Sequence, residues 1–295
     1  MNLTVENFLV HLRLKFILFL VPIYLYGIVI SDGTIFTWNF LIEFIILHVF
    51  IYGGVNALND YYDRDEHGPI GGLENPPPVY GHSLFYLAWL WKLIGFYLSM
   101  KYSSSMKFVI GTFIGICMSV AYSHPKIRLK GDPFWSTLTV VALQGFLTYY
   151  FGTIVDTCNA TSISAFKFWM GACVIMLTTL STYPLSQVYQ IEQDRLQGDQ
   201  TLAIFLGVGK TFQFSCICLF LSGLIHSILL GYYYHWWEGV LIFVNSCALI
   251  YGVQQWKIKF EQQTVVENFK SLHRLLTWQT ICSYLFCFGH LLNIL

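Results

Sequence analysis

Long apolar runs, separated by short polar connections, are the feature that most constrains the fold of this chain. Of its 295 residues, 56% are hydrophobic and only 11% are charged. An apolar helix of about 20 residues is long enough to cross a bilayer, and inside lipid each backbone polar group must be satisfied within its own segment. The sequence therefore predicts an all-α, polytopic membrane protein.

Nine transmembrane helices are expected from the positions of these runs. Their approximate ranges are about 14–31, 36–54, 83–99, 107–123, 136–152, 167–188, 213–233, 236–255 and 276–294. The first run lacks a small-residue cleavage site, which favours a first span over a removable signal peptide. The eight cysteines lie mostly inside apolar runs and form no C-x-x-C pair, which favours small membrane-buried side chains over disulfides or metal ligands.

The positive charges are divided unevenly between the two sides of the membrane that these spans define. The N-terminus and the connections after spans two, four, six and eight carry Arg13, Lys15, Arg64, Lys126, Arg128, Lys130, Arg195, Lys210, Lys257, Lys259, Lys270 and Arg274. The other side carries Lys101, Lys107 and Lys167, and Lys92 lies inside span three. The positive-inside rule therefore predicts a cytoplasmic N-terminus and four cytoplasmic polar connections. With no net charge and no polybasic tail, the sequence gives no sign of a nucleic-acid partner.

A cluster of acidic side chains follows the second apolar run. Three Asp and one Glu lie within residues 60–66 of a chain that is poor in charge. If the preceding helix continues through this cluster, Asn59, Asp63 and His67 share one helical face. Carboxylate and amide oxygens suit Mg2+, which keeps its remaining positions for water and phosphate oxygens. The alternative is a solvated acidic loop that caps a transmembrane helix.

A second acidic stretch follows span six, on the same predicted side because an even number of spans separates the two stretches. Gln190 and Asp194 are one helical turn apart, and Gly198 is expected to end the helix. If the two stretches face each other across a bundle, they suit a diphosphate held through Mg2+, whereas without a cation they repel. A structural role for both is the alternative.

The densest basic run of the chain lies between these two stretches. Lys126, Arg128 and Lys130 follow span four on the same predicted side as the acids. Lys and Arg at a membrane face commonly anchor the chain according to the positive-inside rule. Beside two acidic clusters they are also candidates for direct phosphate ligands. The sequence leaves both roles open.

Three motifs of this chain resemble the signatures of the UbiA superfamily of intramembrane prenyltransferases. The motifs are Asn59-Asp60-x-x-Asp63-x-x-x-His67, the stretch from Tyr189 through Asp194-Arg195-x-x-Gly198 to Thr201-Leu202, and the element that comprises Tyr122, Ser123, Pro125, Leu129 and Lys130. The resemblance covers nearly the whole chain. It implies that residues 1–295 form a single domain of about nine helices around a central cavity, with a cytoplasmic cap.

The activity that this resemblance implies is the Mg2+-dependent transfer of a prenyl group from an isoprenoid diphosphate to a small hydrophobic acceptor, often an aromatic ring, within membrane lipid. It assigns Asn59 and Asp63 to one Mg2+ and Asp194 to the other. The wider set of candidate metal ligands is Asn59, Asp60, Asp63, Asp65, Gln190, Glu192 and Asp194. The candidates for binding the diphosphate are Arg13, Asn56, Lys126, Arg128, Lys130 and Tyr189. The candidates for a catalytic role are Asp63, Asp194 and Tyr122.

Two positions depart from the family pattern. His67 stands where the first motif ends in Asp, and Gln190 replaces the first carboxylate of the second pair. The candidates to replace these carboxylates are Asp65 and Glu66 in the first stretch, and Glu192 and Asp199 in the second. The sequence does not decide between them.

The expected chemistry begins with ionisation. The C1–O bond of the diphosphate breaks, and an allylic carbocation forms in a cavity shielded from water. Tyrosine ring faces near the cytoplasmic helix ends are expected to stabilise that cation, and the candidates are Tyr61, Tyr62, Tyr122, Tyr149, Tyr150 and Tyr189. One alternative is a membrane terpene cyclase of the same superfamily, in which the cation is captured by its own chain. Another is a transporter or a non-catalytic lipid-binding membrane protein.

Overall fold

The chain folds into long helices joined by turns. The computed structural model describes residues 4–64, 68–75, 77–78, 80–155 and 163–295. Within these ranges the only β-type pairing is an isolated bridge between Ile70 and Leu73. The elements are α1 (Val5–His11), α2 (Leu14–Ile17), α3 (Val21–Ile30), α4 (Trp38–Ile45), the π-helix η1 (Ile46–Ile51), α5 (Tyr52–Asp63), α6 (His82–Tyr102), α7 (Met106–Ser123), the 3-10 helix η2 (Leu129–Gly131), α8 (Pro133–Val140), the π-helix η3 (Val141–Leu147), α9 (Thr148–Ile154), α10 (Ala165–Gln187), α11 (Ile191–Leu196), α12 (Leu202–Leu206), α13 (Val208–Tyr233), α14 (Trp236–Lys259), the 3-10 helix η4 (Phe260–Gln262) and α15 (Val265–Leu291).

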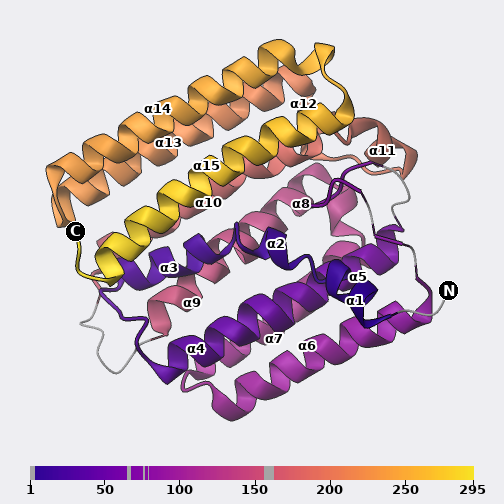
Figure 1. Ribbon diagram of the computed structural model, residues 1–295, viewed down its shortest axis with the longest axis horizontal. Helices are drawn as coiled ribbons and strands as arrows, with labels where there is room; N and C mark the ends of the chain where they lie inside the picture. Colours follow the sequence, from indigo (N-terminus) through magenta and orange to yellow (C-terminus); the bar gives the residue numbers. More distant parts are fainter. Residues whose placement is uncertain (1–3, 65–67, 76, 79, 156–162) are drawn as a thin grey trace.

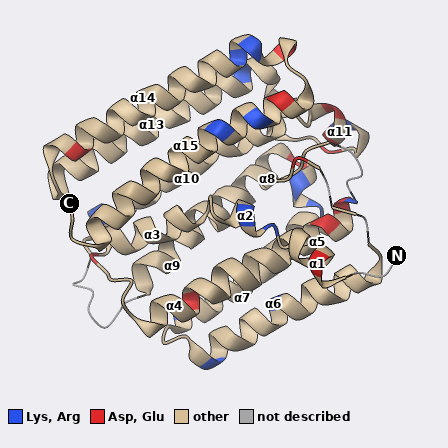
Figure 2. Ribbon diagram, viewed as in Figure 1, with Lys and Arg blue, Asp and Glu red and all other residues tan. Residues whose placement is uncertain are grey.

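The long helices lie side by side and run back and forth between two ends of the molecule (Figure 1). Helices α13, α14 and α15 lie on one side, α4 to α7 lie on the other, and α3, α9 and α10 lie between them. One end, which we call the charged end, contains α1, the last turn of α5, and α11, and most of the Lys, Arg, Asp and Glu residues gather there (Figure 2). The chain ends at the opposite end of the molecule.

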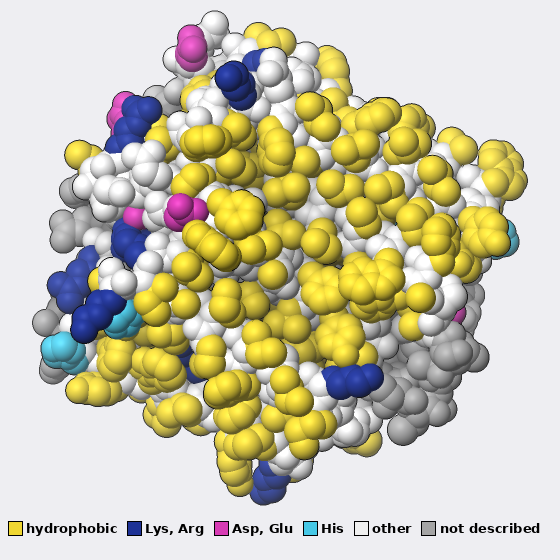
Figure 3. Space-filling view, turned by 180° about the vertical axis from the view of Figure 1, so that it is seen from behind, with side chains coloured by type: hydrophobic (Ala, Val, Ile, Leu, Met, Phe, Trp, Pro, Cys, Tyr) yellow, Lys and Arg dark blue, Asp and Glu magenta, His cyan; other side chains and the backbone are white. Residues whose placement is uncertain are grey.

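The length and apolarity of the helices make the chain an integral membrane protein. Seven continuous helical stretches of the described chain are long and apolar enough to cross a membrane, and the bent pair Val5–Ile17 and Val21–Ile30 makes up to eight. Hydrophobic side chains cover most of the rear face, with charged residues mainly at its edges (Figure 3). An exposed apolar surface of this extent is expected where lipid replaces water. The all-α membrane fold is confirmed, whereas the exact number of nine spans is not.

The first predicted span is broken, in contrast to the continuous helix expected over 14–31. Arg13 has a positive φ of 50° and separates α1 from α2, and a second break before α3 bends the pair by 40°. Pro22 lies in the first turn of α3, where its missing N–H costs no helical hydrogen bond. The Arg13 side chain, at the first of these breaks, is buried.

The second predicted span continues as a helix beyond residue 54. Helices α4, η1 and α5 form one stretch from Trp38 to Asp63, so the acidic cluster begins on a helix as considered above. The helix ends there because Arg64 adopts the left-handed conformation, with a φ of 51°. The helical face that carries Asn59 and Asp63 is therefore described as far as Asp63. Asp65, Glu66 and His67 lie outside the described residues.

The centre of the bundle depends on a close approach of two helix backbones. A Cβ atom on Gly27 of α3 would lie 2.2 Å from the carbonyl oxygen of Tyr149, and one on Gly152 of α9 would lie 2.0 Å from that of Tyr24. Small residues allow this approach between membrane helices, where dispersion contacts replace the hydrophobic effect as the main source of stability. The contact keeps the broken first span against α9.

Candidate active site

A cavity of about 450 Å³ extends from the charged end into the bundle, and helical segments from α2 to α15 contribute to its walls. Its charged lining residues are Arg13, Asp63, Lys130, Asp194 and Asp199. These residues come from the broken first span, the end of α5, η2 and the region around α11, all of which meet at the charged end. The charged residues of the cavity are therefore gathered at one mouth.

The end of α5 contributes a connected polar group to this mouth. Asn59 donates from Nδ2 to Oδ2 of Asp63 over 2.7 Å, as expected for side chains one helical turn apart. Ser123, at the end of α7, donates from Oγ to Oδ1 of Asn59 over 2.8 Å. The ammonium group of Lys130 forms an ion pair with Oδ1 of Asp63. Because the Asp63 side chain is only 7% exposed, its charge needs a partner, and this cation provides one.

Asp60 lies on another face of α5 and does not line the cavity. Its Oδ2 is 2.9 Å from Nδ1 of His11, and its Oδ1 forms an ion pair with Arg13. Arg13 also donates to the backbone oxygen of Gly71 over 3.4 Å, and its side chain lines the cavity. Because Asp60 lies outside the cavity lining and holds the Arg13 side chain, its geometry is that of a residue that positions Arg13. The metal role predicted for Asp60 gains no support from this arrangement.

Helix α11 presents the second acidic stretch to the same mouth. Gln190 and Asp194 both line the cavity, and the backbone N–H of Asp194 donates to the carbonyl oxygen of Gln190 over 2.9 Å. The Gln190 side chain donates from Nε2 to the carbonyl oxygen of Pro69 over 2.6 Å, which links α11 to the segment after α5. Glu192 is exposed and does not line the cavity. Gly198 has a φ of 78° and follows the end of α11, as expected.

The three basic residues of the predicted run take three different positions. Lys130 lines the cavity beside Asp63. Arg128 donates two hydrogen bonds to Asp199, of 2.6 Å and 2.9 Å, and so fixes the loop that follows α11. Lys126 is exposed and does not line the cavity. The structure therefore pairs Lys130 with Asp63 and Arg128 with Asp199, and of the three basic residues Lys130 alone lines the cavity.

The remaining candidates line the cavity just below its mouth. Asn56 donates to the carbonyl oxygen of Leu12 over 3.1 Å, and the hydroxyl oxygens of Tyr122 and Tyr183 lie 3.0 Å apart. Tyr189 packs edge-to-face on Phe269, and burial raises the pKa of the Tyr189 phenol, which keeps it neutral. Of the six tyrosines considered as cation stabilisers, Tyr122 and Tyr189 line the cavity. The other four, Tyr61, Tyr62, Tyr149 and Tyr150, do not.

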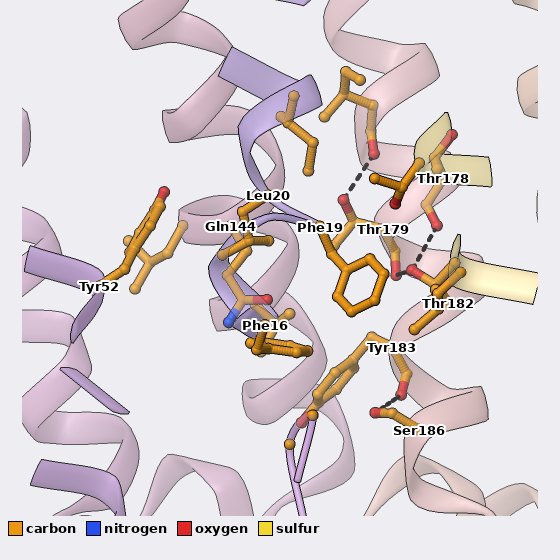
Figure 4. A pocket seen from close by; sticks show the side chains of 18 of the residues that line it. Phe16, Phe19, Leu20, Tyr52, Gln144, Thr178, Thr179, Thr182, Tyr183 and Ser186 are labelled. Atoms are coloured by element: carbon orange, nitrogen blue, oxygen red, sulfur yellow. Dashed lines mark hydrogen bonds between the residues drawn. The ribbon is translucent and has the colours of Figure 1, made fainter. Parts of the chain in front are cut away.

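Several lining residues were not singled out from the sequence. Figure 4 shows Thr178, Thr179, Thr182, Tyr183 and Ser186 along α10, opposite Phe16, Phe19 and Leu20 of the broken first span. Gln144 projects into the same space from η3. The run of hydroxyl-bearing residues in an otherwise apolar helix was a usable signal for α10. The contribution of Phe16 and Phe19 was not predictable, because it depends on the break at the start of α3.

The chain is thus a polytopic helical membrane protein with an internal cavity whose mouth combines carboxylate, amide and basic groups from segments distant in sequence. It belongs to the UbiA prenyltransferase family, whose model matches residues 20–278. This finding confirms the resemblance inferred from the three motifs.

Three curated proteins are similar in sequence to this chain. The chain is 25% identical over 147 residues to a lycopene elongase/hydratase of Haloarcula japonica, covering 49% of this chain and 45% of that protein. It is 27% identical over 181 residues to a digeranylgeranylglyceryl phosphate synthase of Methanothrix thermoacetophila, covering 59% and 62%, respectively. A synthase of the same name from Methanosphaera stadtmanae is 26% identical over 256 residues, covering 83% and 85%. The chain thus spans less than two thirds of the length of the first two.

Solved structures share the fold over nearly the whole chain. A UbiA homolog from Archaeoglobus fulgidus has a TM-score of 0.66 at 16% identity, covering 97% of this chain and 99% of that one. The same homolog bound to GPP and Mg2+ has a TM-score of 0.65 at 14% identity, covering 94% and 99%. At these identities the likeness establishes the fold alone.

Proposed function

We propose that this protein catalyses the Mg2+-dependent transfer of a prenyl group from an isoprenoid diphosphate to a small hydrophobic acceptor, such as an aromatic ring, within the membrane. The observation that carries the proposal is the meeting of Asp63 and Asp194, from two distant helix ends, at the mouth of one cavity inside a membrane bundle. Arg13 and Lys130 supply positive charge at that mouth. The names of two relatives support the same reaction class. So do the GPP and DMAPP bound in solved structures that share the fold of this chain.

The oxygen donors at the mouth fit a small divalent cation. Asn59, Asp63 and Asp194 would hold Mg2+, which needs one or two carboxylates and shares its other positions with phosphate oxygens and water. When bound, Mg2+ supplies positive charge that stabilises the departing diphosphate. No group of three or more His, Cys, Asp or Glu side chains is assembled for a metal in the part of the chain that the structure describes.

The basic residues at the mouth are placed to bind the diphosphate. Lys130 is an ammonium donor beside Asp63, and the guanidinium of Arg13 is held by Asp60 with its side chain along the cavity wall. Charge-assisted hydrogen bonds of this kind bind phosphate oxygens strongly, and Arg offers two donors in a fixed fork. We assign these two residues to the departing diphosphate.

In the proposed reaction, the hydrocarbon tail of the prenyl diphosphate lies in the cavity below the mouth. The C1–O bond of the prenyl diphosphate breaks, and its electron pair remains on the diphosphate oxygen. The acceptor donates an electron pair to C1 and then loses a proton. Tyr122 and Tyr189 line the cavity, and their ring faces would stabilise the positive charge on the allylic fragment. The apolar walls exclude water, which would otherwise capture that fragment.

We infer the orientation of the protein in the membrane from the distribution of its Lys and Arg residues. The charged end, with the N-terminus and the polar connections, faces the cytoplasm because it carries most of the Lys and Arg residues. The diphosphate then binds from the cytoplasmic side, and the tail enters the membrane-embedded cavity.

The experiment that tests the function measures diphosphate release by the purified full-length protein in detergent. Prenyl diphosphates of C10 to C20 are supplied with Mg2+ or EDTA, with and without a panel of aromatic acceptors. Release that requires both Mg2+ and an acceptor, with formation of a prenylated product, is the expected result. Release without acceptor, accompanied by a hydrocarbon, would identify a cyclase instead. No release with any donor and acceptor would contradict both and return transport or lipid binding to consideration.

A further inference from the structure

Below its charged mouth, the cavity has a wall that is polar but carries no charge. This polar wall is formed by one side chain of α3 and five from α13, α14 and α15: Tyr26, Ser222, His226, Ser246, Gln279 and Ser283. Every lining residue from α13 to α15 lacks a carboxylate, ammonium or guanidinium group. The charged end and the polar wall therefore suit different chemical groups.

Helix α15 carries this polarity into the membrane. It is 27 residues long, yet it is not among the described helices that are apolar enough to span a bilayer. Its cavity face contains Gln279, Thr280 and Ser283. Polar side chains at membrane depth are costly unless they pair with each other or line a cavity. Their position on the cavity face leaves them accessible to a ligand.

Two polar atoms of the wall lack a partner. Nε2 of His226 and the hydroxyl oxygen of Tyr26 are buried and make no hydrogen bond within the described residues. The two rings lie edge-to-face with their centroids 5.1 Å apart, and both line the cavity. Tyr26 is 4% exposed, so water outside the protein does not satisfy its hydroxyl. Native structures seldom retain buried polar atoms without hydrogen-bond partners unless these atoms have a functional role.

The neighbouring hydroxyl of Ser222 behaves differently. Its Oγ lies 2.8 Å from Oγ1 of Thr178 and donates to the carbonyl oxygen of Val174 over 3.0 Å. This side chain therefore ties α13 to α10 and leaves its oxygen as an acceptor only. The donors that remain for a ligand are the Tyr26, Ser246 and Ser283 hydroxyls and the Gln279 amide. The imidazole of His226 is a further polar contact.

The wall also has the length to accommodate an extended molecule. His273 lines the cavity near Phe19, whose ring centroid is 5.6 Å away, and Ser283 lies further along the same helix. Ten residues of α-helix separate them, which corresponds to about 15 Å. A ligand along this wall can place one end close to the diphosphate and its other polar atoms deep in the membrane.

We propose that the polar wall binds the acceptor, and that the acceptor is an elongated neutral amphiphile with hydroxyl or carbonyl groups. This inference rests on the proposed function, because a ligand of this wall is an acceptor only if the protein transfers a prenyl group. The binding site itself is defined by the residues of the polar wall. A carboxylate or phosphate on this wall would lose its hydration without gaining a cation, because the cations of the cavity are all at the mouth. Neutral hydroxyl and carbonyl groups match the donors and acceptors present.

The test uses three probes of equal chain length, an alkylphenol, the matching alkylbenzoate and the matching alkylbenzene. Their binding to the purified protein in detergent is measured as a shift in thermal unfolding, without any prenyl diphosphate. We expect the alkylphenol to bind about 10-fold more tightly than either of the other two, the effect of roughly one hydrogen bond made or one charge left unpaired. Gln279→Leu and Tyr26→Phe should each remove most of this preference.

The matched control is Thr277→Val, which replaces an exposed polar residue of α15 that does not line the cavity. It should retain the preference for the alkylphenol. Stabilisation of each variant by geranyl diphosphate with Mg2+ serves as a second measurement, because it reports an intact charged mouth. Gln279→Leu and Tyr26→Phe should retain it.

The outcomes separate the two proposals. Equal binding of the three probes, or a preference for the alkylbenzoate, would overturn the neutral acceptor site. A preference that survives Gln279→Leu and Tyr26→Phe would overturn the assignment to the polar wall. Selective alkylphenol binding that both variants abolish, in a protein that releases no diphosphate, would support the site and count against the proposed prenyl transfer.

Discussion

At the scale of single residues, α11 offers a direct comparison of two carboxylates that are two positions apart. Asp194 lines the cavity, whereas Glu192 is exposed and outside it. Under the proposed function we expect Asp194→Asn to lower kcat/KM by at least about 100-fold, as the loss of an important electrostatic contact does in other enzymes. Glu192→Gln should stay within about twofold, in line with the small effects of exposed substitutions. A large loss with Glu192→Gln, measured as diphosphate release, would contradict the assignment.

The ion pair between Arg13 and Asp60 gives a second prediction at this scale. Breaking a buried pair leaves one charge uncompensated and typically costs about 3–5 kcal/mol. Asp60→Asn and Arg13→Met should therefore each lower the thermal unfolding temperature in detergent. The double variant should be less destabilised than the sum of the two, because it leaves no unpaired charge. Strict additivity in this double-mutant cycle would show that the two side chains do not depend on each other.

The sequence anticipated Asn59 and Asp63 better than it anticipated Asp60. Helical spacing alone places Asn59 and Asp63 on one face, and the hydrogen bond between them follows from it. The partners of Asp60 are His11 and Arg13, whose positions depend on a helix break that no local pattern indicated. The same limit applies to the basic run, since only the folded connection shows that Lys130, rather than Lys126, reaches the cavity.

At the scale of helices, the contact between α3 and α9 gives a prediction about stability. Gly27→Ala would place a Cβ atom 2.2 Å from the carbonyl oxygen of Tyr149, so the two helices must separate. Overpacking of this kind typically costs about 1–3 kcal/mol and often more where backbone must move. Gly209→Ala in α13 is the matched control, because a Cβ atom there meets no atom within 4 Å.

The expected results for the two glycine variants have opposite signs. Gly27→Ala should lower the unfolding temperature in detergent, whereas Gly209→Ala should leave it unchanged or raise it, since Ala favours a helix over Gly by up to about 1 kcal/mol. Equal behaviour of the two variants would show that the backbones of α3 and α9 can separate without cost.

The start of α15 gives a prediction about pH. Thr264 and Glu267 form a capping box, and the hydrogen bonds from Thr264 hold the pKa of Glu267 below its usual value. A carboxyl with a lowered folded-state pKa contributes stability above its unfolded pKa, and this contribution is lost as the pH falls through the folded value. Glu267→Gln should therefore be less stable than the wild type at pH 7, and the difference should shrink toward pH 4. Thermal unfolding at the two pH values checks it, and a constant difference would contradict it.

Helix positions were largely predictable because each long apolar run has to form its backbone hydrogen bonds internally. Seven of the nine expected spans correspond to continuous stretches such as α6, α7 and α10. The prediction of a continuous first span was wrong, because the helix breaks there are stabilised by tertiary contacts such as the ion pair between Arg13 and Asp60. The last span, α15, is helical as expected but too polar for a plain membrane helix, and its polarity has a reason only once the cavity is known.

At the scale of the whole molecule, the separation of charge between the two ends predicts the orientation in the membrane. Lys126 is exposed at the charged end, whereas Lys101 lies at the far end of α6. The positive-inside rule places the charged end in the cytoplasm, because Lys and Arg resist translocation across the membrane. Lys126→Cys and Lys101→Cys, each in a chain whose native cysteines are replaced by serine, report the two sides with a membrane-impermeant maleimide. Lys126→Cys should react only in inside-out vesicles and Lys101→Cys only in right-side-out vesicles. The reverse pattern would place the diphosphate site outside the cytoplasm, and a mixed pattern for one position would show that the chain inserts in both orientations.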